Sequence, residues 1–405
     1  MKVVIVGAGP AGASLAMALA RAGLTVNLVE AAARFQRSFR GDALMPSGLE
    51  ALERLGLLPI PSQLPQRPLG GWRVAVEGRT LFQLAEPLEG AGARPCTLVS
   101  QDAWLSWLLN EAPRPASLSL QLGEPVGELQ RNGDGRVCGV VLASGQVLPA
   151  DVVVGCDGRA SLLRRRAGLA LCRAASAIDV LWFCFATGAQ PLPDDCFTTL
   201  VGPAALASLF TGANGQVQLG WGIAPQAPTP SLTPGDWITQ LAAQAPPPLA
   251  HWLVANARHL GEPVRLSVQV GMVERWWQPG LLLLGDAAHP MSAVRAQGIN
   301  MALRDAAVAA DQLIAASAAS PAVGSHHQAI DRALSAIETA RRPEVERLQQ
   351  LQADELQRGE LLRQLPPLRW ALAAAAPVIG PRIAQHWRHQ QLPLRHGIAP
   401  LPVQQ

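Results

Sequence analysis

Residues 1–30 read MKVVIVGAGPAGASLAMALARAGLTVNLVE, and this stretch decides the fold. The apolar run at residues 3–6 predicts a short buried strand, and the alanine-rich segment that follows, to about Ala22, predicts a helix. A second apolar run, at residues 25–29, ends on the acid Glu30. Strand, helix and strand in this order predict a parallel βαβ unit at the start of an α/β fold.

Three glycines between the first strand and the helix point to a ligand. Gly7, Gly9 and Gly12 have the spacing GxGxxG. In a βαβ unit such glycines allow a tight turn, a close approach of the backbone to a pyrophosphate, and close packing of the helix on the strand. Glu30 ends the second strand, where a carboxylate accepts hydrogen bonds from a ribose. The stretch therefore predicts a dinucleotide site, without distinguishing NAD from FAD.

A second informative stretch, residues 280–311, reads GLLLLGDAAHPMSAVRAQGINMALRDAAVAAD. Its four leucines predict a strand that is buried on both faces, and Asp286 follows this strand directly. Helical spacing begins at Gln297, so a loop separates the strand from a helix. Ligands of open α/β sheets bind at this edge, where a helix start presents unpaired N–H groups and a positive dipole end. Residues 151–158, DVVVGCDG, repeat the pattern of a buried strand followed by glycine and acid, here Asp157.

The composition is that of a globular protein. Hydrophobic residues make up 49% and charged residues 16% of the 405 residues, which excludes a disordered chain and allows two or three domains. The net charge is +3, but the arginines are scattered, so we expect no nucleic-acid partner. The chain begins directly with a strand and contains no run of about 18 apolar residues, so we expect neither a signal peptide nor a membrane span. The 6 cysteines have no metal-ligand spacing, which favours free thiols, no metal and a cytoplasmic location.

The middle of the chain predicts a separate sheet. Two short strands surround Glu77 and Gly78, residues 118–154 have the alternation of a β-meander, and further strands follow at 180–186, 206–211, 216–223 and 264–270 between proline-rich connections. The aromatic side chains expected to line a substrate pocket on these strands are Trp182, Phe183, Phe210 and Trp221. The predicted division is a discontinuous dinucleotide-binding domain of residues 1–70, 95–175 and 270–340, a substrate domain of residues 71–94 and 176–269, and a helical region of residues 341–405.

The glycine fingerprint with Glu30, the DG pair at Asp157 and the GD pair at Asp286 occur in one chain in this order. Together they resemble the class A FAD-dependent monooxygenases, the aromatic hydroxylases with the p-hydroxybenzoate hydroxylase fold, over roughly residues 1–350. The resemblance implies a Rossmann-like FAD-binding domain with an inserted, mostly antiparallel substrate sheet and a helical tail. It implies cofactor contacts at Gly7, Gly9, Ala11, Gly12, Glu30, Arg40, Gln101, Asp157, Asp286, Gly298, Ile299 and Asn300.

Three residues within the stretch 280–311 are candidates for a catalytic role. Ala293 and Arg295 occupy places where the family commonly has proline and glycine. Arg295 either points to water, or lies near the flavin and substrate, where it stabilises the reduced flavin or holds a carboxylate or phosphate. The chain has no tyrosine to carry a proton from a phenolic substrate, which leaves His289 as a candidate base or as a structural histidine. The only lysine is Lys2 on the first strand, which argues against the related flavin-dependent halogenases and their lysine near the substrate.

The resemblance implies that the protein uses NADPH or NADH as a transient reductant, and O2, to hydroxylate a hydrophobic, ring-containing small molecule through a flavin hydroperoxide. The expected partners are this substrate and O2, and the chain is expected to be a monomer or a homodimer. An FAD-dependent reductase or dehydrogenase of an isoprenoid-like lipid would share the three motifs, as would a non-catalytic flavin-binding protein. The apolar run at residues 371–379 is too short to span a bilayer, which leaves packing against the body or a weak peripheral contact with a membrane.

Overall fold

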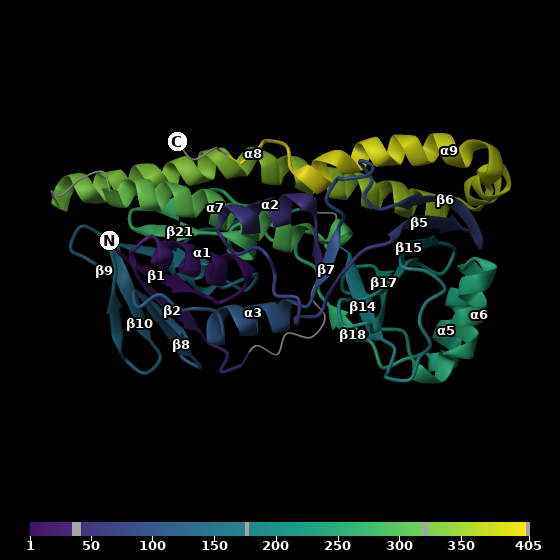
Figure 1. Cartoon of the computed structure of the whole chain (residues 1–405), viewed down its shortest axis with the longest axis horizontal. Coiled ribbons are helices and arrows are strands. Elements are labelled where there is room, and N and C mark those ends of the chain that lie inside the picture. Colours follow the sequence, from purple (N-terminus) through teal and green to yellow (C-terminus); the bar gives the residue numbers. More distant parts are fainter. Residues whose placement is uncertain (35–41, 175–177, 319–322, 402–405) are drawn as a thin grey trace.

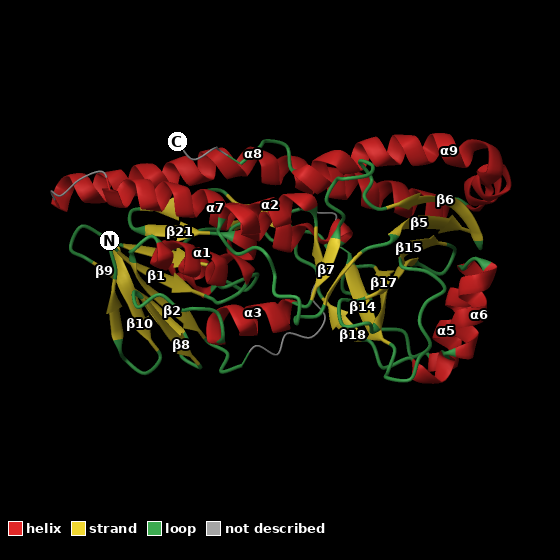
Figure 2. Cartoon of the chain, in the orientation of Figure 1, coloured by secondary structure: helices red, strands yellow, loops and turns green. Residues whose placement is uncertain are grey.

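The computed structural model describes residues 1–34, 42–174, 178–318 and 323–401. Two sheet-containing halves lie side by side, and two long C-terminal helices extend along both of them (Figure 1). The first half contains the N-terminal strands, and the second half contains the strands of the middle of the chain (Figure 2).

The first half is built on a six-stranded sheet. All neighbouring strands in it are parallel except the first pair. In spatial order the strands are β20 (Trp277–Gln278), β21 (Leu281–Leu283), β12 (Val152–Gly155), β1 (Lys2–Val6), β2 (Thr25–Glu30) and β8 (Leu118–Leu122). The apolar runs of β1, β12 and β21 are buried, as strands of a parallel sheet covered on both faces must be. The predicted Rossmann-like sheet is confirmed.

Five helices belong to this half. Helix α1 (Pro10–Arg21) follows the glycine loop and packs against α7 (Gln297–Ala318), which also contacts α2 (Pro46–Arg54). The other two helices are α3 (Gln101–Asn110) and the short α4 (Leu162–Arg166). Helix α2 begins at Pro46 and ends just before Gly56, as its leucine stripe predicts.

The region expected to be one meander is divided between two sheets. Strand β8 pairs in parallel with β2 and so extends the first sheet. Only β9 (Val126–Arg131), β10 (Val137–Leu142) and β11 (Val147–Pro149) form an antiparallel sheet of their own. Alternation of apolar and polar residues is the same in both settings, so the pattern does not reveal the pairing partner.

The second half contains a seven-stranded, mostly antiparallel sheet, as predicted. In spatial order its strands are β18 (Val264–Leu266), β14 (Asp179–Cys184), β17 (Val217–Ile223), β16 (Leu206–Thr211), β15 (Cys196–Val201), β5 (Gly71–Val76) and β6 (Arg79–Ala85). Helices α5 (Pro234–Gln244) and α6 (Pro247–Ala255) pack on one face of this sheet, where the sequence indicated only strands and connections. Two small sheets complete the strands: β3 (Ala43–Leu44), β7 (Thr97–Val99) and β4 (Gln66–Pro68) form one, and β13 (Leu171–Arg173) and β19 (Gly271–Val273) form the other.

The tail consists of helices α8 (Val323–Gln364) and α9 (Pro366–His396), which pack against each other. Helix α8 also packs along α7, and α9 packs on β5 and β6. Residue 340, where the sequence suggested that a separate tail begins, lies inside α8, so no element boundary falls there. Among the helices in the described part of the chain, none has the length and apolarity needed to cross a membrane.

Candidate functional site

A cavity of about 1080 Å³ connects the two halves of the molecule. At one end it is lined by the glycine loop after β1, and along its length by the residues that follow β12 and β21. At the other end it is lined by the seven-stranded sheet and by side chains of α8 and α9. The motifs singled out in the sequence therefore meet at one continuous space.

The glycine loop leaves no room for side chains. Gly7 has a φ of +98°, and a Cβ on it would lie 2.3 Å from the carbonyl oxygen of Cys156. A Cβ on Gly12 would lie 1.9 Å from the carbonyl oxygen of Gly7. Gly7, Gly9 and Ala11 line the cavity, whereas Gly12 does not and acts only by letting α1 approach the loop. The loop thus presents bare backbone to a ligand, as pyrophosphate binding requires.

Two carboxylates, Glu30 and Asp157, line this end of the cavity. Glu30 accepts hydrogen bonds from the backbone N–H groups of Ala8 (2.8 Å) and Ala32 (3.0 Å), and it still lines the cavity. Asp157 accepts one from Leu163 (3.0 Å) with its Oδ2, while its buried Oδ1 has no partner among the described residues. Because a carboxylate has about four acceptor positions, both residues fit a ligand rich in hydroxyl groups.

Two arginines that the motifs did not identify connect the loops after β12 and β21. Arg159 forms an ion pair with Asp286, with 2.9 Å between Nε and Oδ2, and both residues line the cavity. Arg164 is buried and donates hydrogen bonds to the carbonyl oxygens of Ala287 (2.8 Å) and Arg159 (2.7 Å). The sequence shows three consecutive arginines here but not which of them is buried.

Helix α7 starts at the cavity wall. Gly298 and Ile299 in its first turn line the cavity, and the position of a Cβ on Gly298 would be 3.7 Å from Oδ1 of Asp286. Asn300, expected beside the flavin ring, does not line the cavity, and its amide is fully buried within the protein. It accepts a hydrogen bond from the N–H of Met45 (2.8 Å) and donates to the carbonyl oxygen of Ala43 (3.1 Å). Asn300 therefore anchors the segment around β3 to α7.

Gln101, the first residue of α3, lines the cavity, and its contact with a cofactor stays a prediction. Arg40 lies outside the described residues.

The far end of the cavity is aromatic, but only two of the four predicted aromatic residues face it. Trp182 and Phe210 line the cavity, with their ring centroids 6.0 Å apart. Phe183 and Trp221 instead pack against Trp237 of α5, on the opposite face of the sheet, so their assignment to the pocket was wrong. Successive side chains of a strand point to opposite faces, so Trp182 and Phe183 cannot both face the cavity.

Other residues of the aromatic wall come from elements that the sequence did not connect. Trp72 of β5, Phe197 of β15 and Trp387 of α9 also line the cavity. The ring centroids of Phe197 and Phe210 are 5.0 Å apart in a stacked arrangement. Gly220 and Gly222 face the cavity from β17, and their lack of side chains leaves space beside the rings.

Arg295 lies at the cavity with its charge already paired. Its guanidinium lies over the rings of Trp72 and Trp387, 5.0 and 4.9 Å from their centroids. Its Nε is 2.9 Å from Oε1 of Glu355, a residue of α8. The side chain is only 6% exposed, so the expectation that it points to water is wrong, and the anion that it holds is part of the protein. Ala293, in the same loop, lines the cavity and is exposed.

His289 is not a candidate base, because it does not line the cavity. Its ring is buried against Trp276, and its Nε2 lies 2.6 Å from Oδ2 of Asp305. Burial opposes ionisation of Asp305, but His289 and Arg341 outweigh this effect and lower the pKa of Asp305 to about 2. His289, Asp305 and Arg341 form a buried ionic cluster beneath the loop that follows β21. His289 thus has the structural role that the sequence left open as an alternative.

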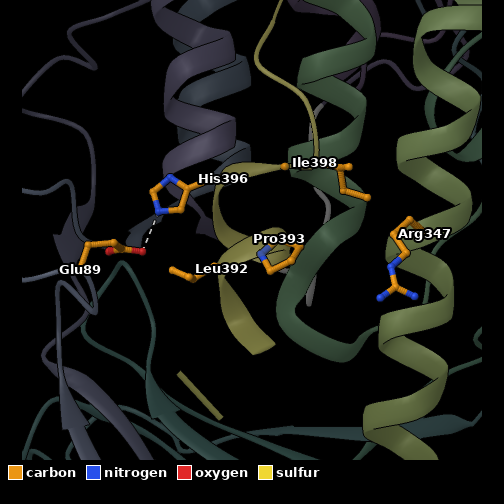
Figure 3. Close-up of a pocket in the computed structure, with 7 residues that line it drawn as sticks. Glu89, Arg347, Leu392, Pro393, His396 and Ile398 are labelled. Carbon is orange, nitrogen blue, oxygen red and sulfur yellow. Dashed lines mark hydrogen bonds and ion pairs between the residues drawn. The ribbon is translucent and has the colours of Figure 1, made fainter. Parts of the chain in front are cut away.

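A second, smaller pocket of about 460 Å³ lies near the C-terminal end of α9. Glu89 and His396 face each other across its edge, with 2.7 Å between Oε1 and Nε2, while Arg347 of α8 borders it on the other side (Figure 3). Burial would raise the pKa of Glu89, but hydrogen bonds from Arg395 and His396 lower it to about 2. This pocket shares no lining residue with the larger cavity, and its charged groups attach α9 to the body.

Comparisons with known sequences agree with this geometry. A family model described as FAD binding domain matches residues 1–329. The 6-methylpretetramide 4-monooxygenase of Streptomyces rimosus is 33% identical over 357 residues, which cover 86% of this chain and 82% of that protein. The 3-demethoxyubiquinol 3-hydroxylase of Escherichia coli K12 is 26% identical over 77% of this chain and 79% of that protein.

Solved structures share the fold. Pseudomonas aeruginosa PqsL, in complex with 2-aminobenzoylacetate, superimposes with a TM-score of 0.75 at 24% identity and covers 92% of this chain and 98% of its own. Klebsiella pneumoniae HpxO, complexed with FAD and uric acid, superimposes with a TM-score of 0.71 at 22% identity, and the match covers 97% of each chain.

Proposed function

The chain belongs to the FAD binding domain family of FAD-dependent monooxygenases, and we propose that it hydroxylates a hydrophobic, ring-containing small molecule with NADPH or NADH and O2. The observation that carries this proposal is the shape of the cavity. It runs without interruption from a glycine loop suited to a pyrophosphate to a wall of aromatic side chains suited to a ring.

The residues of the cavity fit the two halves of such a reaction. We propose that Gly7, Gly9, Glu30 and Asp157 hold the adenosine and pyrophosphate portion of FAD, and that Asp286 accepts hydrogen bonds from its ribityl chain. Bound FAD, reduced by the nicotinamide cofactor, supplies the activation of O2. The start of α7 near Gly298 stabilises negative charge on a neighbouring ligand group, because the unpaired N–H groups and the dipole of the helix point into the cavity. The aromatic wall keeps water away from the reacting ring.

The relatives named above support oxygenation over the two other functions that share these motifs. A reductase or dehydrogenase of an isoprenoid-like lipid would consume no O2 in its productive reaction, and a non-catalytic flavin-binding protein would show no substrate-stimulated oxidation of NAD(P)H. The test is a screen of NADH and NADPH oxidation by the purified protein with 6-methylpretetramide, a short-chain 3-demethoxyubiquinol, 6-hydroxynicotinate and urate, the kinds of compound in the names of its relatives. Products that gain one oxygen atom support the proposal, and oxidation that no compound stimulates contradicts it.

We predict that Asp286→Ala weakens FAD retention by about one to two orders of magnitude, because a hydrogen bond to a charged group contributes about 1.5–3 kcal/mol. Equilibrium dialysis of the purified variant, followed by measurement of the flavin absorbance, gives the affinity. The control is Asp134→Ala, in an exposed turn between β9 and β10 that is outside the cavity lining. An Asp286→Ala protein that retains FAD as well as this control would remove Asp286 from the proposed cofactor contacts.

We predict that Trp182→Ala changes the ratio of kcat/KM between two turned-over compounds by up to about tenfold, since an aromatic contact contributes about 0.5–1.5 kcal/mol. FAD content should stay unchanged. Phe183→Ala is the matched control, because this neighbouring ring points away from the cavity. It should lower the free energy of unfolding by about 3–5 kcal/mol while leaving the ratio in place. A ratio that responds to Phe183→Ala and not to Trp182→Ala would show that the pocket lies elsewhere.

A further inference from the structure

Asp42 is a carboxyl group in the wall of the cavity that has no role in the cofactor contacts proposed above. It lies immediately before β3, and its carbonyl oxygen accepts a hydrogen bond from the N–H of Val99 (2.8 Å). The next residues are attached to α7 by the side chain of Asn300, which bonds to Ala43 and Met45. The backbone that carries Asp42 is therefore held from two sides.

The carboxyl group of Asp42 has no ion-pair partner among the described residues. The backbone N–H of Gln101, at the start of α3, and the side chain of Gln218 lie close enough to it to favour its ionised form. Two other carboxylates of the cavity differ in this respect. Asp286 is paired with Arg159 and Glu355 with Arg295. Among the described residues, no adjacent arginine therefore stabilises the ionised form of Asp42.

The location of Asp42 is the aromatic end of the cavity. The next residue, Ala43, packs against the hydrophobic cluster that contains Phe210 of β16. The nearby Gln218 lies on β17 directly opposite Phe210 and Cys184 of β14 in the sheet register. Trp182, two residues before Cys184, points to the same face of β14 and lines the cavity. The buried Nε1 of Trp182 has no acceptor among the described residues. The cavity is therefore lined by Asp42, whose carboxyl group has no ion-pair partner, and by Trp182, whose N–H has no acceptor, among the described residues.

The surroundings of Asp42 favour its protonated form. Burial is the largest effect and raises the pKa of Asp42 to about 7, with a further contribution from the nearby charge of Asp102; the backbone N–H of Gln101 and the side chain of Gln218 act in the opposite direction. Burial raises the pKa of the Cys184 thiol on β14 to about 11, with a smaller effect from the charge of Asp42, so this thiol is neutral near pH 7. An acid or base is most effective when its pKa is close to the working pH.

We propose that Asp42 is a catalytic acid–base residue that accepts the proton of a ring hydroxyl or ring N–H group on the substrate during oxygenation. This inference rests on the proposed function, and it assigns to Asp42 the proton transfer for which the chain has no tyrosine and for which His289 is out of reach. The O–H or N–H bond of the substrate breaks, and its electron pair stays on the ring and enriches it for attack by an electrophilic oxygen. The proton forms an O–H bond with the carboxylate of Asp42, and no electrons are exchanged between the two groups.

The test compares the wild type with Asp42→Asn and Asp102→Asn, using the compound of the screen that gives the most hydroxylated product. Product formation by the wild type should rise with pH through a midpoint near 7. Asp42→Asn should lose this midpoint and form product about a hundredfold more slowly at pH 8, within the usual contribution of general-base catalysis. Asp102→Asn should keep the rate and move the midpoint to lower pH, because it removes the nearby negative charge.

A second measurement needs no substrate. In infrared difference spectra of the resting enzyme, the band of a protonated carboxyl group should titrate near pH 7 in the wild type and be absent in Asp42→Asn. Because the pKa is raised in the folded protein, the wild type should also lose stability relative to Asp42→Asn as the pH rises from about 4 to about 7.

The outcomes distinguish a failure of the catalytic role of Asp42 from a failure of the proposed monooxygenase function. If the carboxyl group titrates near 7 but Asp42→Asn keeps both the rate and the midpoint, the catalytic role is overturned while the monooxygenase function stands. A carboxyl group that titrates near 4 overturns the role as well. If no compound is oxygenated by the wild type, the proposed function falls and the role of Asp42 falls with it, whatever the infrared titration shows.

Discussion

Gly12→Ala should abolish tight binding of FAD, although Gly12 itself does not line the cavity. The added Cβ would lie 1.9 Å from the backbone oxygen of Gly7, so the glycine loop must move away from α1. Overpacking costs typically 1–3 kcal/mol, and a clash with backbone lies at the upper end of that range or above it. We therefore expect FAD affinity to fall by about two orders of magnitude or more, measured by equilibrium dialysis of the purified protein.

The matched control is Gly133→Ala. Gly133 lies in the turn between β9 and β10, has no atom within 4 Å of an added Cβ, and does not have a positive φ. Its variant should bind FAD as the wild type does. Circular dichroism shows whether the Gly12→Ala protein is folded, and a folded variant with unchanged FAD affinity would contradict the proposed place of the pyrophosphate.

Asp305→Ala should give the largest loss of stability among single substitutions in the loop and helix that follow β21. The carboxylate of Asp305 is 0% exposed and is 2.6 Å from Nε2 of His289 and 2.9 Å from Nε of Arg341. It also accepts a hydrogen bond from the N–H of Gly285 (3.1 Å). Removal of one partner from a buried ion pair leaves the other charge uncompensated, which costs about 3–5 kcal/mol. Urea-induced unfolding, followed by tryptophan fluorescence, measures the change.

The pH dependence of this effect has a defined sign. The pKa of Asp305 is lowered in the folded protein from 3.8 to about 2, so its contribution is present above pH 4 and is lost as the pH falls toward 2. The stability difference between the wild type and Asp305→Asn should shrink over that range. Glu128→Gln breaks an exposed pair with Arg166 and should change the free energy of unfolding by no more than about 0.5 kcal/mol. An Asp305 variant as stable as this control would show that the cluster does not support the loop.

Features that are local in the sequence were predictable. The glycine fingerprint, the acids after three buried strands and the helix start at Gln297 each depend on residues within a few positions of one another. Strands of a parallel sheet end at one edge, so these local patterns also predict that Gly7, Asp157 and Asp286 meet there. The cavity lining contains all three.

The strand residues whose side chains point in the same direction could have been predicted from the sequence, but they were not. Trp182 and Phe183 are consecutive, so at most one of them can face a pocket. In β17 the two glycines, on one face, alternate with Leu219 and Trp221, on the other. This alternation does not decide whether the face with the glycines or the face with the large side chains lies beside a ligand. Helix α5 also had a local signal, because Thr233 and Asp236 form a capping box around Pro234. The neighbouring prolines suggested a connection instead.

Features that depend on distant residues had no signal in the sequence. The partner of Arg295 is Glu355, and its two aromatic neighbours, Trp72 and Trp387, come from opposite ends of the chain. The burial of His289 depends on Arg341 and Asp305 in two different helices. Asp42 is unremarkable in the sequence, and its raised pKa follows only from the way in which α3 and the seven-stranded sheet enclose it.

The most direct test of the monooxygenase function is the origin of the oxygen atom in the product. The purified protein is incubated with NADPH or NADH, the most effective compound of the screen and oxygen-18 gas, and the product is analysed by mass spectrometry. We predict one atom of oxygen-18 in each hydroxylated product and none when oxygen-18 is supplied as water. A product that carries oxygen from water, or a reduced product without added oxygen, would contradict the assignment of this chain as a monooxygenase.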